Sequence, residues 1–91
     1  MFSPHFHVMP IRKKESKDLI LHERRIFARK FKQARKQAGL TQKALSRITG
    51  LTQPYLSDVE NAKSTINLDN ANVLAAAVGQ PLWQLLTPEE K

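Results

Sequence analysis

The sequence predicts an all-α domain. Apolar residues recur every three or four positions in several segments, and no segment alternates with the two-residue period of a strand. Glycine or proline separates these segments, with glycines at positions 39, 50 and 79. A length of 91 residues fits one compact domain with a small core.

The N-terminal residues 1–15 show neither period and contain Pro4 and Pro10, so we expect a flexible basic arm there. Met9 is an alternative start. From Ser16, a plausible N-cap, no proline or glycine occurs before Gly39. Apolar residues with helical spacing predict one long helix or two short ones, and they are Ile20, Phe27, Phe31, Ala34 and Ala38.

The positive charge is concentrated at the N-terminal end of the chain. The net charge is +7, yet residues 1–47 carry +10 and residues 48–91 carry −3. The predicted first helix contributes the exposed cations Arg24, Arg25, Arg29, Lys30, Lys32, Arg35 and Lys36. A basic face is typical of proteins that bind a polyanion such as nucleic acid, although a solvated surface has the same composition.

Two short helices follow, joined by a glycine turn. Thr41 is the expected cap of a helix over 42–48, whose apolar residues Ala44, Leu45 and Ile48 share one face. Residues 49–51 form the turn. Thr52 is the expected cap of the next helix, with Pro54 in its first turn and with Leu56 and Val59 on its buried face.

The remaining residues predict two more helices and a tail. Residues 62–68 read as a loop, and Asn67 or Asp69 begins a helix that continues to Val78. Pro81 opens a last helix over 82–86. Residues 88–91 are the C-terminal tail.

Helix, glycine turn and helix over residues 41–63 form a helix-turn-helix pattern. Its residue identities resemble the Cro/C1-type family, also called the Xre family, over about residues 24–87. The matching motifs are Thr41-Gln42-x-x-Leu45, Gly50-Leu51-Thr52-Gln53, Tyr55-Leu56-Ser57 and Val59-Glu60-Asn61-x-Lys63. The resemblance implies a five-helix, lambda-repressor-like domain over 16–87 that binds double-stranded DNA.

The second helix of such a pair enters the major groove, so its first turns need short polar side chains. Thr52, Gln53, Tyr55, Ser57 and Asp58 are available. Gln53 can pair with adenine at two points, and Thr52 and Pro54 can contact a thymine methyl group. Asp58 can accept from cytosine N4, although phosphates repel a carboxylate; the resemblance implies base contacts for Gln53 and Asp58.

The other candidate DNA-binding residues are expected to hold phosphate. Gln42 begins the first helix of the pair, where an amide and free backbone N–H groups can bind an anion, and the resemblance implies this role. Tyr55, Ser57, Asn61 and Lys63 are expected beside the same backbone. The alternatives are an exposed helix former for Gln42 and a core aromatic for Tyr55.

Three further positions carry structural expectations. The resemblance implies an ion pair between Arg35 and Glu60, which would stabilise the domain without touching bases. Ala62 stands where the family often has glycine, and an alanine in the left-handed region costs about 1 kcal/mol.

The last helix carries the expected dimer interface, Trp83 and Leu86. The resemblance implies this contact, and one subunit offers few base contacts for an operator. The alternatives for Trp83 are packing on the first helix and a stacking platform for bases.

We expect a bacterial or phage transcriptional regulator, with a repressor favoured, that binds an operator as a homodimer. Activators and restriction-modification controllers have the same sequence features. The N-terminal extension, residues 1–23, motivates a second hypothesis, an antitoxin that neutralises a partner protein and regulates its own operon. In a third hypothesis, residues 16–38 form a helix that binds a membrane surface.

Other functions are not expected. No catalytic constellation or phosphate-cradling glycine loop can be assembled, so an enzyme is not predicted. His5 and His7 offer too few ligands for a closed metal site. We expect no cofactor, small-molecule ligand or membrane segment. Absence of cysteine suits a reducing cytoplasm.

Overall fold

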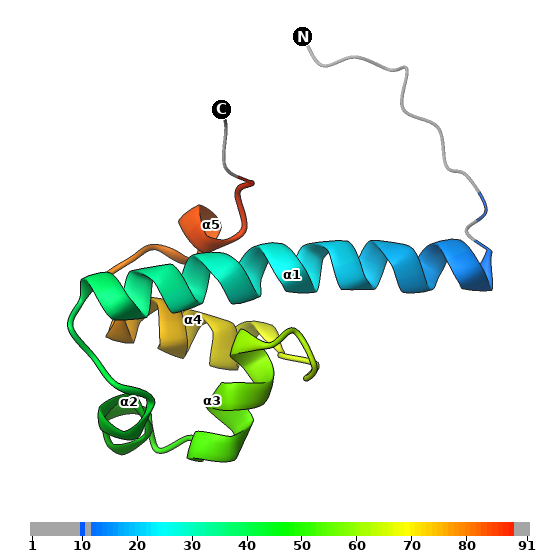
Figure 1. Cartoon of the computed structure of the whole chain (residues 1–91). Coiled ribbons are helices and arrows are strands. Elements are labelled where there is room, and N and C mark those ends of the chain that lie inside the picture. Colours follow the sequence, from blue (N-terminus) through cyan, green and yellow to red (C-terminus); the bar gives the residue numbers. More distant parts are fainter. Residues whose placement is uncertain (1–9, 11, 89–91) are drawn as a thin grey trace, which may run out of the picture.

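The structure is a computed structural model that describes residue 10 and residues 12–88. This part of the chain contains five α-helices and no strand (Figure 1). The helices are α1 (Lys13–Gln37), α2 (Gln42–Thr49), α3 (Gln53–Glu60), α4 (Leu68–Ala77) and α5 (Leu82–Leu85). The all-α, five-helix prediction is therefore confirmed. Most of the predicted N-terminal arm, with His5, His7 and Met9, lies outside the described residues, as do residues 89–91.

Helix α1 is one continuous helix of 25 residues, about 37 Å long. It begins three residues before Ser16, whose N–H donates to the carbonyl of Arg12 at 2.8 Å, so Ser16 lies inside the first turns and is not the cap. Only its C-terminal half packs against the other helices, and the N-terminal half extends beyond them (Figure 1). Gly39, with φ 74°, ends the segment as expected.

The caps predicted for the next helices are present. The Thr41 hydroxyl accepts from the Ala44 N–H at 3.0 Å, and the Thr52 hydroxyl accepts from the Tyr55 N–H at 3.3 Å. At α4 the structure selects Asn67 over Asp69, because the Asn67 side chain accepts from the Asn70 N–H at 2.7 Å. Pro81 precedes α5, which ends one residue earlier than predicted.

The core lies where all five helices meet. Phe27 and Phe31 of α1 stack with ring centroids 5.7 Å apart. Fully buried leucines from the other helices complete the core, namely Leu45, Leu56, Leu74 and Leu85. The burial predicted for Leu56 and Val59 is confirmed, and this burial fixes which side of α3 faces outward.

Three apolar residues that helical spacing groups with core residues are exposed, contrary to expectation. Ile48 is 60% exposed, because Gln42, Leu45 and Thr49 form the row of α2 that faces the protein, which leaves Ile48 on the flank. Ile20 lies on the extended half of α1, and Ala38 follows its last turn, so both are exposed.

The cations of α1 also depart from the expected exposure. Arg35 is buried, and Arg24 and Lys30 are half-buried. Arg35 is buried because it pairs with a carboxylate, as described below, whereas the other four predicted cations are exposed.

Candidate nucleic-acid interface

The turn between α2 and α3 is held in one conformation by two side chains that precede Gly50 and bond the backbone of Leu51, which follows it. The Ser46 hydroxyl donates to the carbonyl of Leu51 at 2.6 Å, and the Thr49 hydroxyl accepts from the Leu51 N–H at 3.2 Å. Gly50 adopts φ 79°, which other residues rarely do. These contacts fix the angle between the two helices. Sequence reasoning identified the glycine but missed Ser46, whose partner lies in the following turn.

The first turn of α3 is presented to solvent, while its opposite side is buried. Thr52, Gln53 and Pro54 are exposed, whereas Leu56 and Val59 are buried in the core. The Thr52 hydroxyl is occupied by its cap bond, so its methyl group remains for outside contacts. Helix α3 contains no lysine or arginine. The surface that it offers is neutral apart from Asp58, which is exposed.

The other predicted contact residues lie on α3 or just after it, and they differ in exposure and in the hydrogen bonds that their side chains make. Tyr55 is half-buried, and its hydroxyl accepts from the side chain of Asn70 on α4 at 3.3 Å. Ser57 is half-buried. The Asn61 amide donates to the Ser57 carbonyl at 2.9 Å, while Lys63 is exposed beyond the end of α3. No sequence signal pointed to Asn70, whose contact spans 15 residues.

Gln42 is half-buried and joins the buried ion pair. Its amide nitrogen donates to Glu60 Oε1 at 3.1 Å, and that carboxylate is held on its other side by Arg35. The amide has a second N–H, and the first backbone N–H groups of α2 have no intrahelical partner. Gln42 is therefore positioned by Glu60, at a helix end that can bind an anion.

Helix α3 ends in the strained geometry expected from Ala62. This alanine has φ 59°, and the Lys63 N–H closes the end of the helix on the carbonyl of Asp58 at 2.8 Å. The left-handed alanine is confirmed. The backbone before Lys63 thus closes α3 with a bond from the Lys63 N–H to the carbonyl five residues earlier, as in a Schellman motif.

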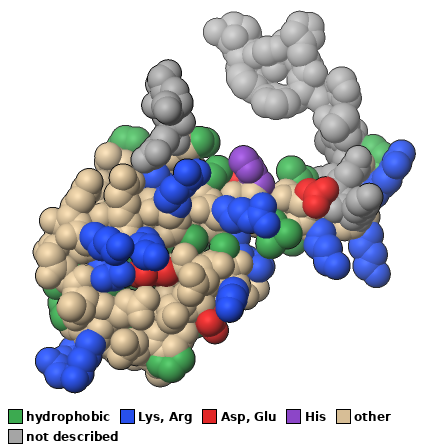
Figure 2. All heavy atoms as spheres, in the orientation of Figure 1, with side chains coloured by type: hydrophobic (Ala, Val, Ile, Leu, Met, Phe, Trp, Pro, Cys, Tyr) green, Lys and Arg blue, Asp and Glu red, His purple; other side chains and the backbone are tan. Residues whose placement is uncertain are grey.

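Positive charge is found on α1 and α2, whereas α3 carries no cation. Helix α1 contains ten Lys or Arg residues against three Asp or Glu residues, and Figure 2 shows Lys and Arg side chains gathered along it. Two exposed cations of α2, Lys43 and Arg47, were not singled out from the sequence. Lys43 lies in the first helical turn, where the helix dipole opposes a cation. That unfavourable placement was the available signal for a functional lysine.

Metal and membrane sites are not found in the part of the chain that the structure describes. No three His, Cys, Asp or Glu residues there are grouped closely enough to hold a metal ion. Within the same residues, no helix combines the length and the apolar character needed to cross a bilayer.

The fold and the α2–turn–α3 unit define a helix-turn-helix protein of the DNA-binding class. Residues 31–82 match the model of the family HTH_3, described as helix-turn-helix, and the chain belongs to this family. The resemblance to the Cro/C1-type, or Xre, family is thereby confirmed.

Individual relatives agree with this assignment. The Neisseria hypothetical transcription factor of Neisseria meningitidis serogroup B (strain ATCC BAA-335 / MC58) is 35% identical over 68 residues, which are 75% of this chain and 64% of that protein. The matched region thus spans less than two thirds of this relative.

Two solved structures are similar in sequence and in fold. The hypothetical transcription factor NHTF from Neisseria has a TM-score of 0.70 and 32% identity, with 89% of this chain and 88% of that chain covered. The restriction-modification controller protein C.AhdI from Aeromonas hydrophila has a TM-score of 0.66 and 26% identity, with 70% and 97% covered.

Proposed function

We propose that this protein is a sequence-specific, DNA-binding transcriptional regulator that binds an operator as a homodimer. Each subunit places α3 in the major groove of one half-site. The two recognition helices then lie about 34 Å apart, one turn of DNA, so the operator has two-fold related half-sites. Repression is the favoured outcome, since a dimer on an operator blocks access to it.

The exposed first turn of α3 carries this proposal. Thr52, Gln53 and Pro54 point away from the core while the opposite face of the helix is anchored in it, so the fold presents these side chains. Gln53 can form two hydrogen bonds with adenine, worth about 1–3 kcal/mol in discrimination. Asp58, exposed one turn later, is placed to accept from cytosine.

Attraction for DNA of any sequence comes from other residues. Lys63 is exposed just after α3, and Gln42 and Lys43 lie at the start of α2, so the two ends of the unit can hold phosphates on either side of the groove. Tyr55, Ser57 and Asn61 complete this edge. In this division of roles neutral groups read sequence and cations supply affinity.

The homodimer is proposed to form through α5. Trp83 is 66% exposed and Leu86 is 40% exposed, so neither packs in the core of its own subunit. The alternative that Trp83 is a core residue is thereby corrected. Large apolar side chains left in water on one short helix favour a protein contact.

Selection of bound sequences from random DNA tests the proposal. We expect enrichment of a two-fold related pair of half-sites whose centres lie about 10 base pairs, or a multiple of one turn, apart. A pool that retains affinity but shows no enriched half-site would contradict specific readout by α3.

An antitoxin role remains the second hypothesis, motivated by the extension over residues 1–23. It requires a partner protein that co-purifies with this chain from its native host. The names of the relatives refer to transcription and to restriction-modification control. If the protein is recovered repeatedly without a partner, the antitoxin hypothesis fails.

A further inference from the structure

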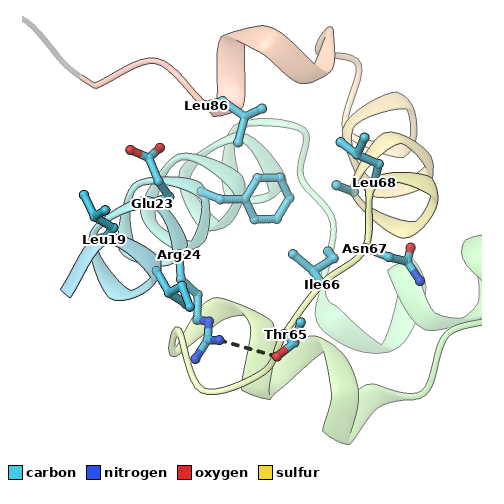
Figure 3. Close-up of a pocket in the computed structure, with 11 residues that line it drawn as sticks. Leu19, Glu23, Arg24, Thr65, Ile66, Asn67, Leu68 and Leu86 are labelled. Carbon is cyan, nitrogen blue, oxygen red and sulfur yellow. Dashed lines mark hydrogen bonds between the residues drawn. The ribbon is translucent and has the colours of Figure 1, made fainter. Parts of the chain in front are cut away.

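An apolar groove of about 450 Å³ lies between the extended half of α1 and the body of the domain (Figure 3). One wall comes from α1, and the other comes from the segment before α4, from the first turn of α4 and from the residue after α5. The apolar lining residues used below are Leu19, Ile20, Phe27, Ile66, Leu68 and Leu86. A concave apolar site of this size can accept an aromatic side chain.

The groove leaves large apolar side chains in water. Leu68 is 72% exposed, and Leu19 and Ile20 are 53% and 51% exposed. At one edge the Arg24 guanidinium donates to the Thr65 hydroxyl at 3.4 Å and ties α1 to the loop before α4 (Figure 3). Contiguous exposed apolar surface of this kind marks an interaction site, because a monomer gains nothing from leaving it uncovered.

The groove adjoins the most prominent apolar side chain of the surface. Leu86, the residue that ends α5, lines the groove, and Trp83 lies three residues earlier in the helix. The Leu86 N–H donates to the Trp83 carbonyl at 3.1 Å, so the two positions are one turn apart. The exposed Trp83 therefore lies one helical turn from a residue that lines the groove.

Helix α5 alone is too small to form a stable dimer. It has four residues, of which Trp83 is the one large apolar side chain that is mostly exposed. A stable interface buries about 800 Å² per partner and involves about 20–30 residues on each side. Additional surface is needed next to α5, and the groove is the apolar surface that continues from it.

We propose that the groove receives Trp83 of a second copy of this chain. Under two-fold symmetry each subunit inserts its tryptophan into the groove of the other, so the contact occurs twice and closes. The proposal rests on the homodimer of the proposed function and assigns a role to the extended half of α1, which forms a wall of the binding hollow. Helix α5 lies across α1 from α2 and α3, so the α5 part of this contact is on the side of α1 away from the first turn of α3 (Figure 1).

The first experiment measures self-association without DNA, by sedimentation and by the fluorescence of Trp83, the single tryptophan of the chain. We expect the wild type to dimerise with rising concentration and its emission to shift to the blue as Trp83 leaves water. Leu68→Lys and Ile20→Lys, on opposite walls of the groove, should each raise the dimer Kd by about tenfold or more. The matched control Ile48→Lys changes an equally exposed apolar residue on α2, outside the groove, and should leave the Kd unchanged.

A mixing experiment tests the exchange between subunits. Trp83→Glu keeps the groove and loses the tryptophan, whereas Leu68→Lys loses the groove and keeps the tryptophan. At a concentration where the wild type is dimeric, each variant alone should be largely monomeric, with helical content equal to that of the wild type. Their mixture should form heterodimers, because the tryptophan of the Leu68→Lys subunit can still enter the intact groove of the Trp83→Glu subunit. At the other contact the introduced carboxylate meets the introduced ammonium group, and opposite charges attract.

Three results would overturn the proposal: a wild type that stays monomeric, groove variants that dimerise like the wild type, or a mixture that stays monomeric. If the wild type is dimeric, either of the last two results is compatible with a homodimer through α5 but contradicts the insertion of Trp83 into the groove. Failure of DNA readout is seen independently, in the sequence selection.

Discussion

The guanidinium of Arg35 binds both carboxylate oxygens of Glu60, with Nε 2.5 Å from Oε2 and the second nitrogen 3.0 Å from Oε1. The third nitrogen donates to the Leu40 carbonyl at 2.7 Å. The two side chains are 10% and 2% exposed. This pair joins the end of α1, the connection to α2 and the last turn of α3, and so holds α3 in place.

Arg35→Met is expected to lower the free energy of unfolding by about 3–5 kcal/mol, because it leaves the Glu60 carboxylate buried without its counter-charge. Urea unfolding followed by circular dichroism measures this loss. Adding Glu60→Leu should recover part of it, since replacing both charges by apolar groups removes the stranded charge. A nearby control, Lys36→Met on the exposed side of α1, should change stability by about 0.5 kcal/mol or less.

If the two single substitutions add up in the double variant, the pair is not coupled and the structural role assigned to it is wrong. Loss of DNA binding in Arg35→Met should follow the unfolded fraction. The loss of DNA binding would then result from displacement of α3, and it would not indicate a direct contact between Arg35 and DNA.

Much of this fold was predictable because the residues that begin and end its helices act locally. Thr41, Thr52 and Gly50 sit at helix ends, and their chemistry is decided by immediate neighbours. The exposure of Ile48 was not predictable in the same way. On α2, Gln42 bonds Glu60 of α3 and the half-buried Thr49 bonds the Leu45 carbonyl of its own helix, and hydrophobic periodicity gives no weight to such bonds.

In the candidate site, too, local features were predictable and tertiary contacts were not. Exposure of Thr52 and Gln53 follows from the burial of Leu56 and Val59, which periodicity predicted. The contacts of Tyr55 with Asn70 and of Gln42 with Glu60 join residues far apart in sequence. Such contacts depend on tertiary packing, so no local pattern reveals them.

Gln53→Ala is expected to relax sequence preference at one base pair of each half-site. Its side chain is exposed at the start of α3 and makes no contact that holds the fold, so the stability of the protein should be unchanged. Affinity for the preferred operator should fall by about 1–3 kcal/mol, with little change for DNA altered at that base pair. Competition binding with single-base operator variants measures the difference. Equal loss on every DNA would argue against base readout by Gln53.

Lys63→Ala is expected to weaken binding to all sequences alike, because Lys63 is exposed beyond α3 and is assigned to phosphate. The plot of log K against log salt should become less steep by about 0.9 for the lost phosphate contact. Titrations at several salt concentrations, on operator and on random DNA, give this slope. An unchanged slope would remove Lys63 from the phosphate contacts.

Ala62→Gly is expected to stabilise the protein by about 0.5–1 kcal/mol. Ala62 has φ 59°, and glycine adopts this conformation without the steric cost of a Cβ atom. The thermal midpoint should rise by a few degrees, since 1 kcal/mol corresponds to about 4–8 °C in a domain of this size. A lower midpoint would mean that the added freedom of the unfolded chain exceeds the relieved strain.

Ile48→Ser and Leu45→Ala are a matched pair of substitutions on α2. They test whether the burial in the structure or the burial expected from the sequence pattern is correct. The periodicity predicts that both residues are buried, whereas the structure leaves Ile48 60% exposed and Leu45 fully buried. Ile48→Ser should therefore change the free energy of unfolding by about 0.5 kcal/mol or less, and Leu45→Ala should lower it by about 2–5 kcal/mol through the cavity left in the core. Urea unfolding of both variants under the same conditions measures the contrast. A loss of several kcal/mol for Ile48→Ser would place Ile48 in the core and contradict the inward row formed by Gln42, Leu45 and Thr49.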